Sequence, residues 1–460
     1  MKTEDIILIC GYGVSGKAAA RLAVSLGKNI VIADEHDSPA MHTETEQLRQ
    51  IQPGLRFFPG WTAEQRLPDC GTVVVSPGIR KNTPLYQAAK NALIPGGKWL
   101  SELEFALRNI HCPFVSITGT NGKTTTTELT TALLRAHGVN AESAGNIGTA
   151  LSGCVQETSR RKLECLVIET SSFQLENIAA FPACPAAVLN LASDHIDRHG
   201  SLEEYARTKF KVLTAERPPE QRIINSNLRP WADKFLPNTE MTTFSAVDPE
   251  ADFSLNADGV IVFRGRKIYD TAGGHLQGLH NAENMMAALA MLRAVRGEDA
   301  LFRPETSEAL QAFRCSPHRM EVFAEYNGIR FVNDSKATNP HAVNAAVRQF
   351  ANGRNLLLIL GGLDKGMDFS ELEISLPHIR QAFLIGRCRD TISAELSGKV
   401  QFRTSESFEE AVKEACEAAL PGDCVMLSPA TASMDMFKNY AERGDIFKSL
   451  VRQWIDSRRP

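Results

Sequence analysis

The 460-residue sequence lacks the features of several specialised classes of protein. Its ten cysteines include no CxxC pair, which argues against a zinc ribbon and a redox dithiol motif. A disulfide framework is not expected in a chain of this length. No apolar run is long enough to cross a membrane, and the first one, residues 6–10, follows an acidic start and is too short for a signal peptide. We therefore expect a cytoplasmic protein with reduced cysteines.

The sequence also lacks an excess of charge of either sign. Its 50 Lys and Arg residues stand against 54 Asp and Glu residues, a formal net charge of −4. This balance provides no general attraction to nucleic acids or anionic membranes. Hydrophobic residues make up 43% of the chain, which is enough for globular cores and argues against disorder. We expect no nucleic-acid partner, no membrane span and a monomeric protein.

Short apolar runs alternate with helical patterns along the whole chain. This alternation is typical of α/β domains with mostly parallel sheets. At about 100–200 residues per domain, the length indicates roughly three domains, and we place the boundaries near residues 110 and 315. A β-hairpin insertion is expected at Asp258-Gly259. Strands are expected over 6–10, 30–33, 72–75, 113–117, 166–168, 186–189, 321–323, 329–332, 356–360, 382–385 and 424–427, and helices over 17–26, 124–137 and 202–213.

A glycine-rich loop, TGTNGKTT at residues 118–125, lies between an expected strand and an expected helix. Its small residues allow backbone amides to approach phosphate oxygens, and a helix N-terminus favours anions. Lys123 can reach the β- and γ-phosphates of ATP, and the Thr124 hydroxyl can bind Mg²⁺. Ile117 stands where the general phosphate-binding loop has its first glycine, so this loop is a variant.

A second glycine-rich loop, Gly11 to Gly16, follows the first expected strand, and Asp34 follows the second one. This spacing is that of a dinucleotide-binding loop whose carboxylate binds ribose, so an NAD-dependent oxidoreductase is one hypothesis. The same backbone amides can hold the diphosphate of another nucleotide. Since a chain with a separate ATP loop has less need of a redox cofactor, we favour the second interpretation.

Acidic and histidine side chains follow two further strands. Glu169 stands at the carboxyl end of a strand, where ligands of parallel sheets gather, and it can bind the same Mg²⁺ as Thr124. The segment 194–199, DHIDRH, can bind a divalent ion or form a solvated polar loop. By itself, Lys209 is expected to be an exposed helix lysine.

Further polar motifs occur in the second half of the chain. Asn281 and Asn284 can bind an adenine edge, although Asn281 is also suited to capping a helix. Asp334 follows a strand and can bind a ribose, whereas Arg319 and Lys336 can offset charge on a transferred phosphoryl group. For Ser433, capping of the following helix is an alternative to binding a ligand.

The motif TGTNGKTTT at 118–126 resembles the ATP loop of the Mur ligase family and of the related folylpolyglutamate synthetases. The resemblance covers nearly the whole chain, because further motifs follow in the family's order at 146–148, 171–176, 194–199, 280–284 and 333–340. It implies three domains: an N-terminal Rossmann-like UDP-sugar-binding domain (1–110), a central P-loop ATPase-like domain that binds ATP (111–315), and a C-terminal Rossmann-like domain that binds the incoming amino acid (316–460).

The resemblance also implies roles for individual residues. For the UDP-sugar these are Val14, Ser15, Asp34, Glu35, Ser76, Pro77, Gly78, Asn146, Ser171 and Gln174. For ATP they are Gly119, Thr120, Asn121, Gly122, Lys123, Thr124, Thr125, Asn281, Asn284, His318, Arg319 and Asp334. For the amino acid they are Thr338, Lys365, Ser433 and Tyr440, the last replacing the phenylalanine of many relatives.

The family uses metal ions and a modified lysine. The implied metal ligands are Thr124, Glu169, His195 and Lys209, the last as a carbamate formed with CO₂. Lys211 is the rival position, but the four-residue offset from Tyr205 favours Lys209. The implied catalytic residues are Lys123, Lys209, His195 and Lys336.

The activity that the resemblance implies is ATP-dependent amide-bond formation in peptidoglycan precursor synthesis. The C-terminal stretches resemble those of members that add D-glutamate to UDP-N-acetylmuramoyl-L-alanine through an acyl phosphate, with ATP and two Mg²⁺ ions. The alternatives are an L-alanine-adding member and a folylpolyglutamate synthetase, although the latter lack the domain that carries Gly11 to Gly16. A dehydrogenase and a non-enzymatic nucleotide-gated module are more distant hypotheses.

Overall fold

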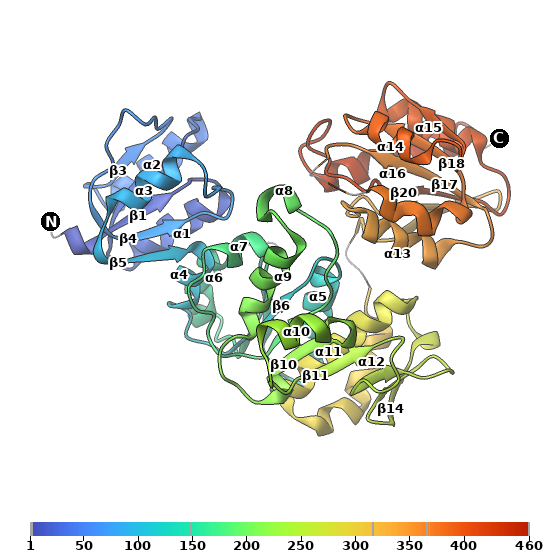
Figure 1. The fold of residues 1–460 in the computed structure, drawn as a ribbon, viewed down its shortest axis with the longest axis horizontal. Coiled ribbons are helices and arrows are strands. Elements are labelled where there is room, and N and C mark those ends of the chain that lie inside the picture. The colour runs from blue at the N-terminus through green and yellow to red at the C-terminus, as the bar shows by residue number, and fades with distance from the viewer. Residues whose placement is uncertain (1–2, 148–149, 315–316, 365–366, 368, 459–460) are drawn as a thin grey trace. The chain divides into compact units, whose positions relative to one another are not determined.

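The computed structural model describes residues 3–147, 150–314, 317–364, 367 and 369–458. The chain forms three mostly parallel sheets with flanking helices (Figure 1), which confirms the predicted α/β class. Contacts divide the chain into two units. Unit 1 comprises Met1–Asn190, Tyr205–Gly273 and Glu283–Ala312, and unit 2 comprises Leu191–Glu204, Gly274–Ala282 and Phe313–Pro460. The domain boundaries near 110 and 315 stay predictions.

The first sheet, in unit 1, has five parallel strands in the order β3-β2-β1-β4-β5. The strands are β1 Ile6–Cys10, β2 Asn29–Ala33, β3 Arg56–Phe58, β4 Cys70–Val75 and β5 Leu93–Ser101, and the helices are α1 Val14–Ser25, α2 Pro39–Ile51 and α3 Pro84–Ala92. Every residue of β1 is buried, as expected for a central parallel strand covered on both faces. The predicted helix start at residue 17 is wrong, because α1 begins at Val14, directly after Gly13.

The second sheet, also in unit 1, has nine strands in the order β14-β13-β12-β11-β10-β9-β6-β8-β7. They are β6 Phe114–Thr118, β7 Ala141–Gly145, β8 Cys165–Glu169, β9 Ala186–Val188, β10 Arg222–Asn225, β11 Thr242–Ser245, β12 Phe253–Leu255, β13 Val260–Phe263 and β14 Arg266–Asp270. The predicted hairpin is confirmed, because β12 and β13 pair antiparallel and Gly259 between them has a φ of +76°.

The helices that follow the first sheet are α4 Glu102–Leu107, α5 Lys123–Ala136, α6 Leu151–Arg160, α7 Ser172–Glu176, α8 Ile196–His199, α9 Leu202–Phe210, α10 Arg229–Phe235, α11 Leu279–Arg296 and α12 Pro304–Ala312. The helix expected over 202–213 is α-helical only to Phe210, and Lys211–Leu213 continue it as a 3₁₀ turn. Asn281 lies inside the first turn of α11, two residues after its start, so the capping interpretation does not fit this helix.

The third sheet, in unit 2, has six strands in the order β15-β16-β20-β17-β18-β19. The strands are β15 Glu321–Tyr326, β16 Ile329–Asn333, β17 Leu356–Gly361, β18 Ile379–Ile385, β19 Phe402–Thr404 and β20 Cys424–Leu427, and the helices are α13 Pro340–Phe350, α14 Arg389–Leu396, α15 Phe408–Ala418 and α16 Tyr440–Asp456. Only β15 runs antiparallel to its neighbour among these described strands. The suggested helix cap at Ser433 is wrong, because α16 begins at Tyr440 and Asn439 caps it.

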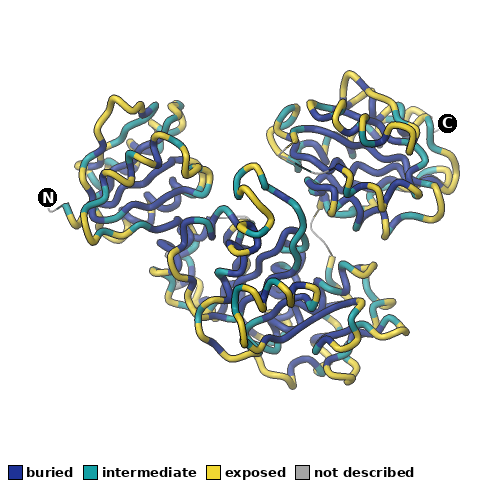
Figure 2. Tube along the Cα trace, viewed as in Figure 1, coloured by how far each residue is buried: buried dark blue, intermediate teal, exposed yellow. Residues whose placement is uncertain are grey.

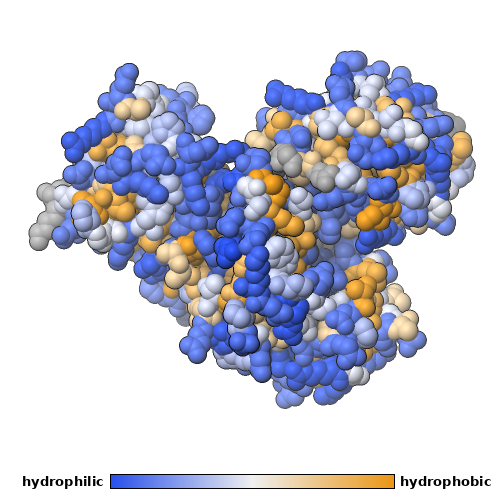
Figure 3. Space-filling view, in the orientation of Figure 1, coloured by the Kyte–Doolittle hydropathy of each residue, from blue (hydrophilic) through white to orange (hydrophobic). Residues whose placement is uncertain are grey.

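The sheets form the buried layer of each unit (Figure 2). In β17, Leu356, Leu358 and Leu360 pack into one hydrophobic cluster, while Leu357 and Ile359 pack into another. Successive strand residues point to opposite faces, so a strand with both faces covered needs a continuous apolar run. The surface seen in Figure 3 is mostly hydrophilic. None of the described helices is both long and apolar enough to span a bilayer.

Candidate active site

The ATP loop connects β6 to α5 at the carboxyl end of the second sheet. Gly122 precedes the helix with a φ of +79°, and a Cβ added there would lie 2.2 Å from Asn284 Oδ1. The Thr126 hydroxyl donates to the same oxygen at 3.2 Å. Glycine is therefore required by both backbone conformation and space. The structure places Asn284 directly against the loop.

Asn190 holds the first half of this loop by hydrogen bonds, a role that the sequence analysis missed. Its Oδ1 accepts a hydrogen bond from Asn121 N at 2.8 Å, and its Nδ2 donates to Asn121 O at 3.1 Å. Thr120 N donates to Asn190 O at 3.0 Å. These bonds extend the parallel pairing of β6 with β9 into the loop. The only signal in the sequence was an asparagine directly after a strand.

Two lysines meet at one carbonyl group of the ATP loop. Lys123 Nζ donates to Gly119 O at 3.0 Å and to Thr120 O at 2.7 Å, and Lys209 Nζ donates to Gly119 O at 2.8 Å. Lys209 is 1% exposed, and its Nζ lies 4.5 Å from the centre of the Tyr205 ring. Lys209 is thus a buried residue of the loop region, and the expectation of an exposed helix lysine is wrong.

The rival lysine has different surroundings. Lys211 Nζ donates to the carbonyl oxygens of Leu175, Glu176 and Ile178 at 3.0–3.2 Å, close to the end of α7. Burial lowers the pKa of Lys211. Since its ammonium group holds a helix end, its contacts are those of a structural lysine, which supports the preference for Lys209.

Glu169 and Thr124 form a small oxygen-rich centre beside the loop. The Thr124 hydroxyl donates to Glu169 Oε2 at 2.7 Å, and Asn146 Nδ2 donates to Glu169 Oε1 at 2.8 Å. A hydroxyl and a carboxylate suit Mg²⁺, which usually takes few protein ligands beside water and substrate phosphates. Within the described ranges, no group of three or more His, Cys, Asp and Glu side chains is placed to hold a metal ion.

A cavity of about 480 Å³ lies in unit 1, at the carboxyl ends of strands from both of its sheets. This is the usual ligand position in parallel α/β folds. It is lined by Gly11, Gly13, Val14, Ser15, Asp34, His36, Ser76, Pro77, Gly78, Ile79, Gly145, Asn146, Ala150, Ser171, Phe173 and Gln174. The structure thus brings together all the predicted UDP-sugar residues except Glu35, whose carboxylate accepts a hydrogen bond from Leu85 N.

The Asp34 carboxylate shapes this cavity. Its Oδ2 accepts a hydrogen bond from Tyr12 N at 2.5 Å, and its Oδ1 accepts one from His36 N at 2.8 Å. Both oxygens are thus engaged by backbone amides of the two neighbouring loops, which limits Asp34 as a ribose ligand. His36, Ile79 and Phe173 also line the cavity and were missed by the sequence analysis: His36 and Ile79 lie outside the motifs, and Phe173 lies within the motif 171–176 without an assigned role.

In unit 2, the predicted nucleotide residues surround the end of β16. Asp334 is 4% exposed; its Oδ2 accepts a hydrogen bond from the Ser428 hydroxyl at 2.8 Å and its Oδ1 accepts one from Met320 N at 3.1 Å. Burial raises the pKa of Asp334 to about 7. His318 is buried with a φ of +67°, and Arg319 beside it is partly exposed.

Of the predicted amino-acid residues of unit 2, Tyr440 is the first residue of α16. Lys336 Nζ lies 3.7 Å from the centre of the Tyr440 ring, and the Ser335 hydroxyl donates to Tyr440 O at 2.7 Å. Ser433 is buried and Thr338 is partly buried. The remaining predicted residue, Lys365, lies outside the described residues.

Arg443 connects these segments and was missed by the sequence analysis. It is fully buried on α16, where its Nε donates to the Ser335 hydroxyl and its Nη2 donates to Ser335 O and Thr431 O. Burial lowers the pKa of Arg443 to about 10, so it remains a cation at neutral pH. Its position four residues before the buried Phe447 was the available signal, because this spacing puts both on one helix face.

The other predicted residues of unit 2 belong to segments from the middle of the chain. His195 precedes α8 with a φ of +56°, and its Nε2 lies 3.6 Å from Asp194 Oδ1. Asn339 Nδ2 donates to Asp194 Oδ2 at 3.3 Å. Asn281 Nδ2 donates to Gln277 O at 2.9 Å. Lys123, Thr124 and Glu169, in contrast, belong to unit 1.

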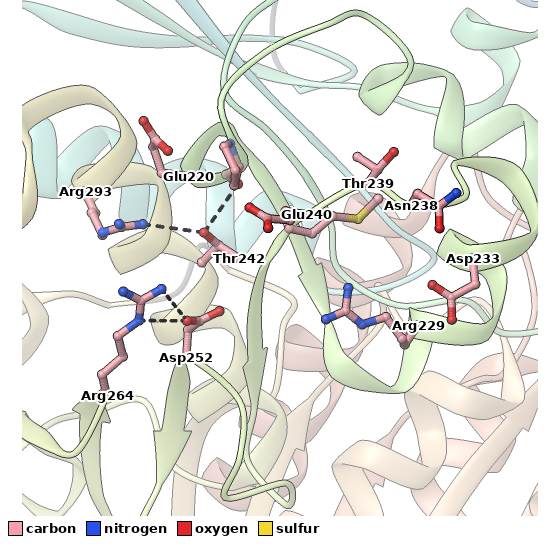
Figure 4. Close-up of a pocket in the computed structure, with 12 residues that line it drawn as sticks. Glu220, Arg229, Asp233, Asn238, Thr239, Glu240, Thr242, Asp252, Arg264 and Arg293 are labelled. Carbon is pink, nitrogen blue, oxygen red and sulfur yellow. Dashed lines mark hydrogen bonds and ion pairs between the residues drawn. The ribbon is translucent and has the colours of Figure 1, made fainter.

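A different cavity, of about 670 Å³, lies near the amino ends of β10 and β11 (Figure 4). Two of its three arginines have partners on the cavity wall: Arg264 pairs with Asp252 at 2.9 Å, and Arg293 donates to the Thr242 hydroxyl at 3.5 Å. Ligands of parallel sheets gather at the opposite, carboxyl ends of strands. We therefore do not assign the reaction to this cavity.

The sequence matches three domain families along the chain. They are the MurD-like N-terminal domain of Mur ligases (residues 5–95), the Mur ligase middle domain (117–292) and the Mur ligase glutamate ligase domain (318–431). Curated relatives match nearly full length. A UDP-N-acetylmuramoylalanine–D-glutamate ligase from Nitrosomonas europaea is 36% identical over 98% of this chain and 96% of the relative, and one from Frankia casuarinae is 37% identical over 97% and 93%.

Solved structures share the fold. The MurF ligase of Thermotoga maritima in complex with ADP aligns with a TM-score of 0.61 and 15% identity, covering 94% of this chain and 96% of that one. The UDP-N-acetylmuramate–alanine ligase of the same organism aligns with a TM-score of 0.57 and 17% identity, covering 98% and 99%. At these identities the likeness concerns the fold alone.

Proposed function

Because this chain belongs to the Mur ligase family, we propose that it catalyses the ATP-dependent addition of D-glutamate to UDP-N-acetylmuramoyl-L-alanine in peptidoglycan precursor synthesis. The observation that carries the proposal is the full-length similarity to curated D-glutamate-adding ligases at about 35% identity. The substrates are small molecules, and we expect the protein to act as a monomer in the cytoplasm.

The reaction proceeds in two steps. The carboxylate of the L-alanyl group attacks the γ-phosphorus of ATP, ADP leaves, and an acyl phosphate forms. The amine of D-glutamate then attacks the acyl carbon, loses a proton, and phosphate leaves. Two anions must meet in the first step, so the protein's task is to position them and to neutralise charge.

The residues of unit 1 suit this task. The sugar nucleotide would occupy the 480 Å³ cavity, whose lining includes Asn146, and Asn146 also contacts Glu169 beside the ATP loop. Lys123 would leave the loop carbonyls that it now contacts and bind the β- and γ-phosphates. Mg²⁺ held by Thr124 and Glu169 would neutralise phosphate charge. The other candidate metal ligands are a carbamylated Lys209 in unit 1 and His195 in unit 2.

The surroundings of Lys209 support its carbamylation. The ammonium groups of the partly buried Lys123 and the buried Lys209 share the Gly119 carbonyl, which places like charges close together. In carbamylation the neutral amine of Lys209 attacks CO₂, a nitrogen–carbon bond forms, and a proton is released. The modification would replace one of the two positive charges by a negative, metal-binding group.

The residues of unit 2 would bind the rest of the substrates. His318, Arg319 and Asp334 would contact the nucleotide, together with Asn281. Thr338, Lys365, Ser433 and Tyr440 would bind D-glutamate, and Lys336 would stabilise charge on the transferred phosphoryl group. Arg443 would hold the segments around Ser335 and Thr431 in place.

The test is phosphate release with ATP, Mg²⁺ and UDP-N-acetylmuramoyl-L-alanine against a panel of amino acids in both enantiomers. Stimulation by D-glutamate alone, with an amide product of the expected mass, is the expected result. Stimulation by L-alanine with UDP-N-acetylmuramate, or by L-glutamate with a folate, would identify another type of amide ligase. NADH formation without ADP would contradict ligase activity.

A further inference from the structure

Glu102 is a buried carboxylate to which the proposed reaction assigns no role. It is the first residue of α4, directly after β5, and its side chain has no exposed surface. Burial raises the pKa of Glu102, and the hydrogen bond from the Ser152 backbone N–H opposes that rise. A carboxylate in such a position is costly unless it makes good hydrogen bonds, so its presence calls for a structural reason.

The carboxylate caps a second helix. Glu102 Oε1 accepts a hydrogen bond from Ser152 N at 2.9 Å. Ser152 is the second residue of α6, and the residue before this helix, Ala150, has no side-chain acceptor. The first N–H groups of a helix have no intrahelical partner, and their partial positive charge favours a carboxylate. Glu102 therefore supplies, from α4, a hydrogen-bond acceptor for the first turn of α6.

Helix α6 connects this cap to the sugar-nucleotide cavity. Ala150, directly before the helix, lines the cavity together with Gly145 and Asn146. Helix α6 packs against both α4 and α1, and α1 begins with Val14 and Ser15, which also line the cavity (Figure 1). The N-terminal end of α6 therefore holds the wall formed by Ala150 in position relative to the wall formed by Val14 and Ser15.

We propose that Glu102 is a positioning residue of the sugar-nucleotide cavity, and that it holds the Ala150 wall in place through α6. The inference rests on the proposed function, because that function identifies the cavity's ligand. Glu102 is not among the described residues that line the cavity, so it acts through Ser152 and α6. Its loss therefore weakens sugar-nucleotide binding and leaves the ATP loop unchanged.

The experiment compares KM values for both substrates in Glu102→Ala. We expect KM for UDP-N-acetylmuramoyl-L-alanine to rise about fivefold or more, the effect of losing a helix cap, while KM for ATP and kcat stay within about twofold. Glu102→Gln should stay close to wild type, because its amide oxygen accepts the same hydrogen bond. Ser152→Ala is the matched control, since it keeps the backbone N–H that Glu102 binds.

An unchanged sugar-nucleotide KM in Glu102→Ala would overturn the inference, and so would an equal rise of both KM values. If Glu102→Ala does not fold, Glu102→Asp serves instead, because its shorter side chain withdraws the carboxylate from Ser152 N. The selective rise is then expected in Glu102→Asp, and a wild-type KM would overturn the inference.

If the wild-type protein shows no D-glutamate-dependent phosphate release, the proposed function fails. Calorimetric titration of wild type and Glu102→Ala with the sugar nucleotide then tests the cap separately: weaker binding by the variant supports it, and equal binding or none overturns it.

Discussion

The carboxyl group of Asp334 should make the stability of the protein depend on pH. Burial raises its pKa from 3.8 to about 7. Between about pH 4 and pH 7 the folded protein holds a proton that the unfolded chain releases, so this group lowers stability as pH rises through that window, by at most about 1.4 kcal/mol per pH unit. Above pH 7 both states are ionised and the penalty stays constant.

Asp334→Asn removes this titration. Its amide oxygen can accept from Met320 N, and its Nδ2 can donate to the Ser428 oxygen, so the local hydrogen bonds are kept. We expect the variant to gain stability relative to wild type between pH 5 and pH 7, measured by calorimetric unfolding at each pH. A difference between the two proteins that does not change with pH would contradict the raised pKa.

Lys123 provides a test of the ATP loop that does not depend on stability. Its ammonium group contacts two carbonyl oxygens of the loop, Gly119 O and Thr120 O, and it would move to the phosphates when ATP binds. We expect Lys123→Ala to lower kcat by about 100-fold or more, the effect of removing one donor to a transition state. Near-wild-type turnover by a folded variant would contradict the assignment of this loop to ATP.

At the scale of elements, the ATP loop depends on the strand beside β6. Asn190 continues the pairing of β9 and makes two side-chain hydrogen bonds with Asn121. A hydrogen bond is worth about 1 kcal/mol, so Asn190→Ala should weaken ATP binding about tenfold and leave sugar-nucleotide binding unchanged. Titration with a fluorescent ATP analogue measures the effect.

A matched control for this variant is Asn140→Ala. Asn140 also makes two side-chain hydrogen bonds, to Arg161 O and Lys162 O, on an exposed part of unit 1. Its loss should leave nucleotide affinity unchanged. Equal weakening in both variants would show that the effect of Asn190 is one of general stability.

The contact between β1 and α1 leads to a second prediction at this scale. A Cβ added at Gly16 would lie 1.9 Å from Gly11 O and 2.8 Å from Ser76 Oγ, so the backbone of the cavity loop would have to move. We expect Gly16→Ala to cost about 1–3 kcal/mol of stability and to raise KM for the sugar nucleotide about tenfold. Gly13→Ala is the control for stability, since no atom lies within 4 Å of its added Cβ, and equal melting temperatures of the two variants would contradict the prediction.

Most elements of this fold could be predicted from local sequence. The strands are continuous apolar runs such as Leu356–Gly361, because both faces of these sheets are covered. The ends of helices were harder to predict than the strands, since they depend on tertiary contacts. Gly16 lies within α1 because its missing side chain allows the helix to approach Gly11, and the sequence alone did not show where the helix begins.

At the scale of the whole molecule, the sequence predicted motifs better than it predicted their grouping. The residues of the UDP-sugar motifs come from separate segments, yet they line one cavity, because parallel strands all end at the same edge. In contrast, Leu191–Glu204 belongs to unit 2, although it lies within the predicted central domain, residues 111–315. This grouping involves contacts such as Asn339 with Asp194, across 145 positions, which no local pattern reveals.

The two units should unfold separately, because each contains its own hydrophobic clusters. Buried thiols report on each unit: Cys10 and Cys165 in unit 1, and Cys416 and Cys424 in unit 2. Burial raises the pKa of all four, so native alkylation near neutral pH should be slow. In a urea series with brief alkylation and mass spectrometry, each pair should become labelled at a shared midpoint, and the two midpoints should differ. A single midpoint for all four cysteines would show that the units unfold as one.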